Sequence, residues 1–346
     1  MKNKNKNKII IIYFLILLVV IIFASTIGVA DIKFIDSLKI ISSKIPFVKN
    51  LVDVSKIKET SKIILLNIRL PRIILSVIIG IALSTSGIVF QAIFKNPMAD
   101  PYILGISSGA AFGATIVIIL GISFSFIGLS AISLGAFIGA IATTTIVYNI
   151  ARINSKAPTV TLLLSGIAIS FFLSALINLI MTFNHDQVEK IVFWTMGSVS
   201  AASWNSVMVS VVPVVVGVII FLVFSKDLNV ILMGEETAQN LGVNVELLKK
   251  ILLVVASIVS ASVVAVSGII GFVGLIVPHA VRIVVGPDHR KLFPFTIITG
   301  ALFMIIADTI SRVALEPTEL PIGVITSLIG APYFIFLLVR NKKVIS

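Results

Sequence analysis

The chain has 346 residues, of which 58% are hydrophobic and 12% charged, and its mean hydropathy is +1.16. One soluble core cannot enclose so much apolar surface, so the composition predicts an all-α, polytopic membrane protein. The formal net charge of +12 does not indicate nucleic-acid binding, because Lys and Arg lie mainly in short segments beside apolar runs. Cysteine is absent, which excludes a disulfide framework, a thiol nucleophile and a cysteine-based metal site.

Ten apolar runs predict about ten membrane helices, since roughly 20 helical residues cross a bilayer core of about 30 Å. The first run follows MKNKNKNK and resembles a signal sequence, but its length exceeds that of a usual signal peptide. We therefore interpret it as a retained membrane helix. The runs cover residues 9–29, 72–94, 102–121, 126–149, 159–182, 205–224, 249–269, 271–285, 293–310 and 321–339.

These runs predict a single transmembrane domain, residues 1–346. It comprises a first helix at about 9–29, an outer loop at 30–71 and a core at 72–340, which includes a cytoplasmic loop at 226–250. An even number of crossings places both termini on one side, and cytoplasmic termini put 16 of the 27 Lys and Arg residues in the cytoplasm. Nine of the other 11 lie between Lys33 and Arg72, in either a solvated loop or a surface for an acidic partner.

Arg69 and Arg72 bracket Pro71 at the predicted outer start of the second span, and Arg312 lies at the outer end of the ninth. Guanidinium groups held at fixed positions can bind carboxylates through paired hydrogen bonds. The alternative is that they anchor the helices at the lipid headgroups. Asp308 precedes Arg312 by four residues and shares its helix face, so the two can neutralise each other.

Small residues recur at helical spacing in the third and fourth spans. Gly105, Gly109 and Gly113 are four residues apart, and Gly135 and Gly139 repeat the spacing. Such faces allow close helix packing, although they could also line a substrate path.

Two polar interruptions are also informative. The glycine-containing break at Ser267–Gly271 predicts a segment buried in protein or facing a water-filled cavity, because lipid cannot satisfy its backbone groups. The sequence GEETAQNLG in the loop 226–250 predicts a short helix, with Glu235 and Glu236 in its first turn and Gly242 after its end. That helix is either a handle for a soluble partner or a connector.

The sequence contains no pattern for catalysis, and we expect no catalytic residue, metal site or cofactor. No GxxxxGK[ST] loop is present for ATP, and no HExxH motif for a metal. The three histidines lie in three different segments, and the serines of Ser86-Gly87 and Ser165-Gly166 have no nearby base.

Six ordered blocks resemble the permease subunit of type II ABC importers, the family that transports iron–siderophore, haem and cobalamin. They are RLPR, SGIVFQAIFKNPMADPYILGISSGA, LLLSGIAIS, GEETAQNLG, GFVGLIVPHAVRIVVGPDHR, and ADTISR with ELPIGVITSLIGAPYFIFLL. The resemblance covers the chain from Arg69 onwards. It implies a ten-helix permease in the cytoplasmic (inner) membrane, paired with a second permease chain, identical or different. Its other partners are cytoplasmic ATPase subunits and an external substrate-binding protein.

The resemblance also assigns roles to individual residues. Arg69, Arg72 and Arg312 match arginines that face acidic groups of the binding protein. The residues that match the coupling helix of the ATPase groove are Gly234, Glu235, Glu236, Ala238, Leu241 and Gly242. The cytoplasmic gate corresponds to Asn96, Pro97, Met98, Pro158 and Thr159, although the sequence around Pro158 departs from the family pattern.

The predicted function is therefore passage of a metal chelate through a central dimer pathway, with ATP hydrolysed by a separate chain. Iron–siderophore is the first expectation for the cargo, with haem and cobalamin behind. The main rival is an ion-coupled secondary transporter with broken helices, which requires an acidic or histidine relay inside the membrane. Only Asp308 qualifies for such a relay. A membrane enzyme is the third class, and it lacks a reactive cluster.

Overall fold

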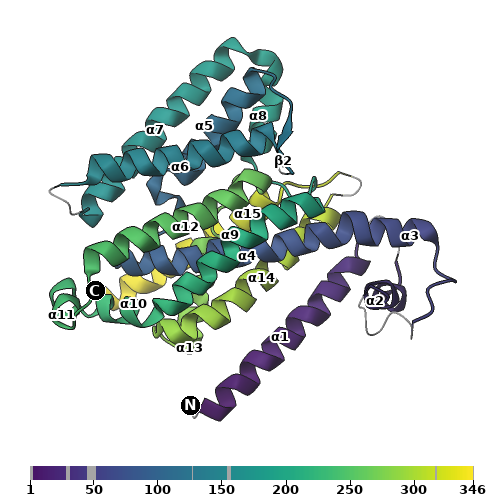
Figure 1. Cartoon of the computed structure of the whole chain (residues 1–346), viewed down its shortest axis with the longest axis horizontal. Helices are drawn as coiled ribbons and strands as arrows, with labels where there is room; N and C mark the ends of the chain where they lie inside the picture. The colour runs from purple at the N-terminus through teal and green to yellow at the C-terminus, as the bar shows by residue number, and fades with distance from the viewer. Residues whose placement is uncertain are drawn as a thin grey trace.

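The computed structural model describes residues 3–28, 32–44, 52–126, 128–153, 157–315 and 318–345. Within these ranges the chain is a helical bundle with one small hairpin (Figure 1). The α-helices are α1 (Asn3–Thr26), α2 (Phe34–Ser42), α3 (Glu59–Ile63), α4 (Leu70–Ile93), α5 (Ile106–Ile119), α6 (Ala131–Ala151), α7 (Thr159–Phe183), α8 (Val188–Thr195), α9 (Trp204–Val223), α10 (Ser225–Leu232), α11 (Glu235–Asn240), α12 (Val245–Ser267), α13 (Val273–Val285), α14 (His289–Val313) and α15 (Ile322–Ile345).

Shorter elements connect the helices. A π-helical turn, η2 (Ile64–Arg69), joins α3 to α4, and 3-10 turns form η3 (Pro101–Leu104) and η4 (His185–Gln187). Strand β1 (Ser125–Phe126) pairs antiparallel with β2 (Leu129–Ser130), with Ser125 opposite Ser130 and Phe126 opposite Leu129.

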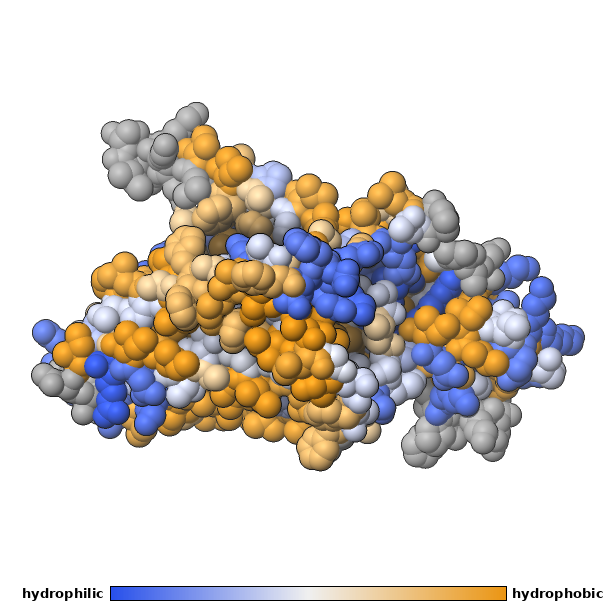
Figure 2. Space-filling model, turned by 90° about the horizontal axis from the view of Figure 1, so that it is seen from above, coloured by the Kyte–Doolittle hydropathy of each residue, from blue (hydrophilic) through white to orange (hydrophobic). Residues whose placement is uncertain are grey.

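Each predicted membrane span coincides with a helix, which confirms the all-α, polytopic class. Seven helices in the described part of the chain are long and apolar enough to cross a membrane, and α5, α13 and the apolar part of α15 are shorter. Apolar side chains cover much of the face seen in Figure 2, as contact with lipid requires. Helices α2, α3, α8 and α10 are not among the predicted elements, and the continuous helix that contains the second span begins at Glu59, within the predicted outer loop.

Polar residues at helix starts set several of these boundaries. The side chains of Ser130, Ser203, Asn244 and Asp288 each accept a hydrogen bond from a backbone N–H in the first turn of α6, α9, α12 and α14. Such caps satisfy N–H groups that have no partner inside the helix.

Helix α4 lies at the centre of the bundle. Nearly every side chain between Pro71 and Ile93 is buried, and α4 packs against α9, α12, α13 and α14. Helix α1 instead packs on α14 through Leu17 and Ala24 and leaves most of its apolar side chains exposed. A helix that is apolar all round and largely exposed is suited to contact with lipid.

Helices α5, α6, α7 and α8 form a group beside this central bundle (Figure 1). Gly109 and Gly113 of α5 lie so close to Gly139 and Gly135 of α6 that a Cβ atom on either α5 residue would overlap the facing backbone oxygen. The backbones of α5 and α6 therefore touch.

Gly105 does not belong to this helical face, because the third span begins later than predicted. Asp100 accepts a hydrogen bond from the backbone N–H of Tyr102 at 2.9 Å and starts the 3-10 turn η3. Gly105 ends that turn in the left-handed region, with φ 77°, and α5 begins at Ile106. Glycine suits position 105 because it adopts this positive φ without steric cost at the end of η3.

The bundle has two distinct ends (Figure 1). The end that holds Arg69, Arg72 and Arg312 is called the arginine end, and the opposite end, which carries α11, is called the α11 end. Helix α1 begins and α15 ends towards the α11 end. The start of α1 and the end of α15 lie at the same end of the bundle, as expected for a chain that crosses the membrane an even number of times.

Candidate functional site

A buried ion network lies at the arginine end. Arg72 Nε on α4 lies 2.7 Å from Asp308 Oδ1 on α14, and Arg72 Nη1 lies 2.7 Å from Glu319 Oε2 before α15. Arg312 Nε lies 3.1 Å from Asp308 Oδ2, so one carboxylate contacts two guanidinium groups. The Asp308 side chain is 0% exposed. Charges as deeply buried as these are stable only when they are paired.

Two arginines also hold the end of α1. Arg69 Nη1 donates to the backbone oxygens of Ser25 and Thr26, at 2.8 and 3.1 Å. Arg312 donates to Ile27 and Ala24 in the same way, at 2.6 and 3.1 Å. The last carbonyl groups of a helix have no partner within it and carry partial negative charge, so cationic donors stabilise them.

The structure thus turns the three arginines inwards, although they are predicted to face a partner. All three are buried in the described part of the chain, because their partners come from α1, α14 and the segment before α15. Their docking role remains a prediction. The predicted pairing of Asp308 with Arg312 is confirmed.

The predicted short helix in the loop 226–250 is α11. Lys249 Nζ, at the start of α12, lies 2.6 Å from Glu235 Oε1 and fixes the first turn of α11. Ala238, in the middle of the same helix, is fully buried. Gly242 follows the helix with φ 84°, and its backbone N–H donates to the Gln239 oxygen at 2.9 Å, in the usual arrangement of a glycine-terminated helix.

Three exposed apolar side chains flank α11, whose own exposed residues are polar. Met233, Leu241 and Leu247 are 70%, 63% and 52% exposed, and Glu236 is exposed beside them. A hollow of about 390 Å³ lies between Leu241 and Phe224, the residue at the end of α9. Apolar side chains clustered in a polar loop indicate a contact surface for another protein.

The predicted gate residues lie in two turns. Asn96 Oδ1 accepts from the backbone N–H of Met98 at 2.9 Å, and Asn96 and Pro97 line a hollow of about 380 Å³ with Arg282. Pro158 is the N-cap residue of α7 and Thr159 is its first helical residue. Among the described residues, no hydrogen bond or ion pair joins the two turns.

The break between α12 and α13 is largely buried in protein, which is the first of the two predicted environments, and its Ile269 lines a cavity. Tyr102 donates from its hydroxyl group to the Ile270 oxygen at 3.0 Å, and the Ser198 N–H donates to the Ser267 oxygen at 2.7 Å. Ile270 is buried. These contacts satisfy backbone groups that lipid would leave without partners.

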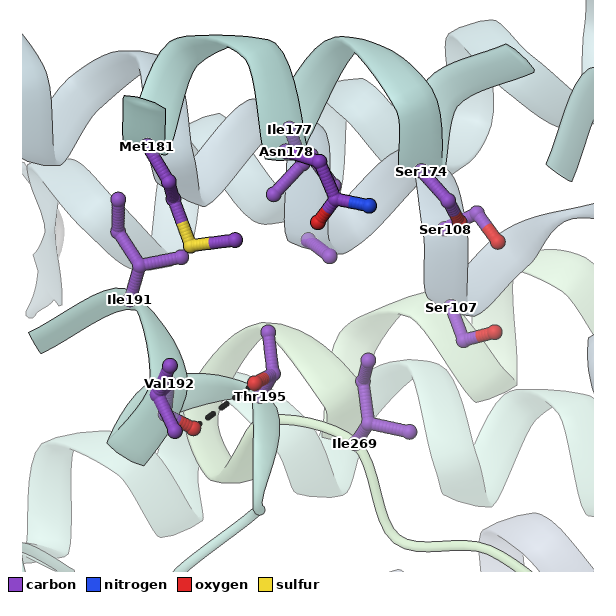
Figure 3. Close-up of a pocket in the computed structure, with 11 residues that line it drawn as sticks. Ser107, Ser108, Ser174, Ile177, Asn178, Met181, Ile191, Val192, Thr195 and Ile269 are labelled. Atoms are coloured by element: carbon purple, nitrogen blue, oxygen red, sulfur yellow. Dashed lines mark hydrogen bonds between the residues drawn. The ribbon is translucent and has the colours of Figure 1, made fainter. Parts of the chain in front are cut away.

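A cavity of about 250 Å³ lies between α5, α7 and α8 (Figure 3). Uncharged polar side chains converge on it from all three helices, among apolar neighbours. The polar lining residues are Ser107, Ser108, Ser174, Asn178 and Thr195. Thr195 Oγ1 donates to the Val192 oxygen at 2.8 Å within α8.

A second hollow, of about 400 Å³, continues along α7 and shares Ser174 with the first. Ser170 and Tyr102 line it together with Asp100. Sequence reasoning did not find either cavity. The available signal was the four-residue spacing of Ser170 and Ser174, which places both hydroxyl groups on one face of a helix.

These features are those of a polytopic membrane protein. It has two distinct ends, a break between α12 and α13 that is buried in protein, and a largely apolar cavity with several polar groups between α5, α7 and α8. The sequence matches the FecCD transport family over residues 16–340. The chain belongs to the FecCD transport family.

Relatives and solved structures agree with this family. The chain is 46% identical to the cobalamin import system permease protein of Halobacterium salinarum, covering 83% of this chain and 76% of that protein. It is 40% identical to the hemin transport system permease protein of Yersinia pestis, covering 80% of this chain and 84% of that protein. It also resembles a solved metal-chelate type ABC transporter in an inward-facing conformation, with 32% identity and a TM-score of 0.81. The match covers 96% of this chain and 99% of that chain.

Proposed function

We propose that this membrane permease is driven by a separate cytoplasmic ATPase chain and receives a metal chelate from an external substrate-binding protein. The α11 end then lies in the cytoplasm, and the arginine end lies outside. Both termini are cytoplasmic in this arrangement. The distribution of Lys and Arg favours this orientation, apart from the nine basic residues between Lys33 and Arg72.

The surface around α11 is the observation that carries the proposal. It combines a fixed short helix, held by Glu235 and Lys249, with exposed Met233, Leu241 and Leu247. A rigid helix docked on a motor protein can transmit movement, whereas a mobile connector cannot. The chain has no phosphate-binding loop of its own, so in this proposal ATP is hydrolysed by the partner that docks on this surface.

The cargo is a metal chelate in this proposal. Two relatives are named for cobalamin and haem import, and the similar solved structure is described as metal-chelate type. An iron–siderophore complex is a third cargo of the same chemical class. The cavity in Figure 3 is lined by hydroxyl, amide and apolar groups, which can contact polar and apolar parts of a passing chelate.

The size of that cavity favours a second permease chain in the pathway. A volume of about 250 Å³ is below the ~300–1,000 Å³ typical of pockets for drug-sized ligands. Haem, cobalamin and siderophore complexes are larger than such ligands. In this proposal the path for such a cargo is completed between two permease chains, identical or different.

An ion-coupled transporter is less well supported. It needs an ionisable group in the membrane that is free to exchange its ion or proton. Asp308, the candidate, is fully buried and contacts both Arg72 and Arg312. Its charge is therefore already compensated.

The test is purification of the permease with its co-expressed ATPase. Leu241→Asp places a charge in the proposed contact and should abolish recovery of the ATPase, while the permease still purifies from the membrane. Leu120→Asp is the matched control, because Leu120 is exposed to the same degree, 64% against 63%, but follows α5. Equal recovery of the ATPase with both variants would refute the coupling role of α11.

A further inference from the structure

Helix α2 is a nine-residue helix at the arginine end that has no role in the function proposed above. In Figure 1 it is seen end-on, whereas α1 and α4 run across the view. Its axis is therefore steeply inclined to the membrane-crossing helices. A helix in this position, beside the last turn of α1, lies roughly parallel to the plane of the bilayer.

One face of α2 is fixed to the protein. The hydroxyl groups of Ser37 and Ser25 form a hydrogen bond between α2 and the end of α1. Ile40 is buried in a small apolar cluster with Ile32 and Leu65. These contacts set the rotation of α2 about its own axis.

A second face of α2 is apolar and exposed. Phe34, Ile35 and Leu38 are 43%, 57% and 38% exposed. At about 100° per residue, these three side chains fall within one sector of the helix, and Asp36 and Lys39 fall outside it. Helix α2 thus has a face on the protein, an apolar face and a polar face.

Two neighbouring features indicate what covers the apolar face. Val19 and Phe23, near the end of α1, are among the exposed apolar side chains that α1 presents to lipid. Helix α2 packs on the end of α1, so this lipid-facing surface and the apolar face of α2 belong to neighbouring helices. Exposed Lys33, Lys39 and Lys44 flank it, and ammonium groups at this level can pair with lipid phosphates.

We propose that α2 is an interfacial helix. It lies among the lipid headgroups of the leaflet at the arginine end, with Phe34, Ile35 and Leu38 inserted towards the acyl chains and its lysines at the phosphate level. This arrangement is typical of amphipathic helices with an apolar face and basic flanks. It also gives part of the basic segment between Lys33 and Arg72 a partner, namely phospholipid.

The position of α2 has a consequence for the ion network. Ser37 holds the last turn of α1, and the carbonyl groups of that turn accept hydrogen bonds from Arg69 and Arg312. A helix resting on the bilayer surface therefore fixes the depth of this part of the bundle.

The absence of cysteine allows a direct test with single-cysteine variants of the full chain. F34C and L38C report on the apolar face, K39C on the polar face of the same helix, and F23C on the lipid-facing side of α1. Each variant is spin-labelled in proteoliposomes of phosphatidylcholine, with and without phosphatidylglycerol. The accessibility of the label to oxygen, which concentrates in lipid, is compared with its accessibility to a water-soluble nickel chelate.

The proposal predicts that labels at positions 34 and 38 have an oxygen-to-nickel ratio several-fold above that at 39 and close to that at 23. It also predicts the same order of ratios in both lipid mixtures. Labels at 34 and 38 that are as accessible to nickel as the label at 39 would overturn it. So would labels that lose nickel accessibility only when the soluble substrate-binding protein is added, because the face would then belong to a protein partner.

Discussion

Arg72 Nε lies 2.7 Å from Asp308 Oδ1, although 236 residues separate the two in the sequence. The pair joins the start of α4 to the last turns of α14. Arg312 adds a second cation to the same carboxylate and binds the end of α1. Three helices that begin or end at the arginine end are thus held by one buried carboxylate.

Replacing that carboxylate should destabilise the bundle. Asp308→Asn leaves two buried guanidinium groups without their shared anion, and the expected cost in the free energy of unfolding is about 3–5 kcal/mol. The measurement is thermal unfolding of the purified protein in detergent. Glu319→Gln is the control, since the Glu319 side chain is 40% exposed and its loss should cost less. Equal unfolding temperatures for the two variants would contradict the proposed role of Asp308.

Charge reversal of Arg72 should prevent assembly of the bundle. The Arg72→Glu variant would place a third carboxylate beside Asp308 and Glu319, which repel it. We therefore expect that little protein extracted from the membrane fraction elutes as a folded peak on size-exclusion chromatography. For comparison, Lys226→Glu changes an exposed lysine in the first turn of α10, near the α11 end, and should leave the yield unchanged. A folded Arg72→Glu protein that fails only to bind its substrate-binding protein would instead support the predicted docking role.

The contact between α5 and α6 should be sensitive to a single methyl group. In Gly113→Ala the new Cβ overlaps the backbone oxygen of Gly135, and such overpacking typically costs about 1–3 kcal/mol of stability. Gly271→Ala is the matched control, because nothing lies within 4 Å of its Cβ position. Comparison of the two melting temperatures checks the prediction. The prediction fails if the Gly113→Ala variant has the same melting temperature as the unsubstituted protein.

The fold could be predicted from the sequence because length and hydropathy define membrane spans directly. Helices α2, α3, α8 and α10 have no clear signal in the sequence, because each has only five to nine residues and mixes polar with apolar positions. Without the family resemblance, the short helix α11 was still recognisable from its acidic first turn and Gly242.

The candidate site was less predictable. The arginines at 69, 72 and 312 were recognised as unusual, but the sequence does not reveal that Glu319 reaches Arg72 across 247 residues. The cavity in Figure 3 depends on how α5, α7 and α8 pack together. Packing of separate helices leaves no local signal in any one of them.

The most direct test of the central claim is uptake of a radiolabelled metal chelate into proteoliposomes that contain the permease. The measurement compares vesicles with the ATPase subunit, ATP and the substrate-binding protein against vesicles with the permease alone and an imposed ion gradient. The account predicts accumulation only in the first set, and loss of that accumulation in the Leu241→Asp variant. Accumulation driven by the ion gradient with no ATPase present would contradict it.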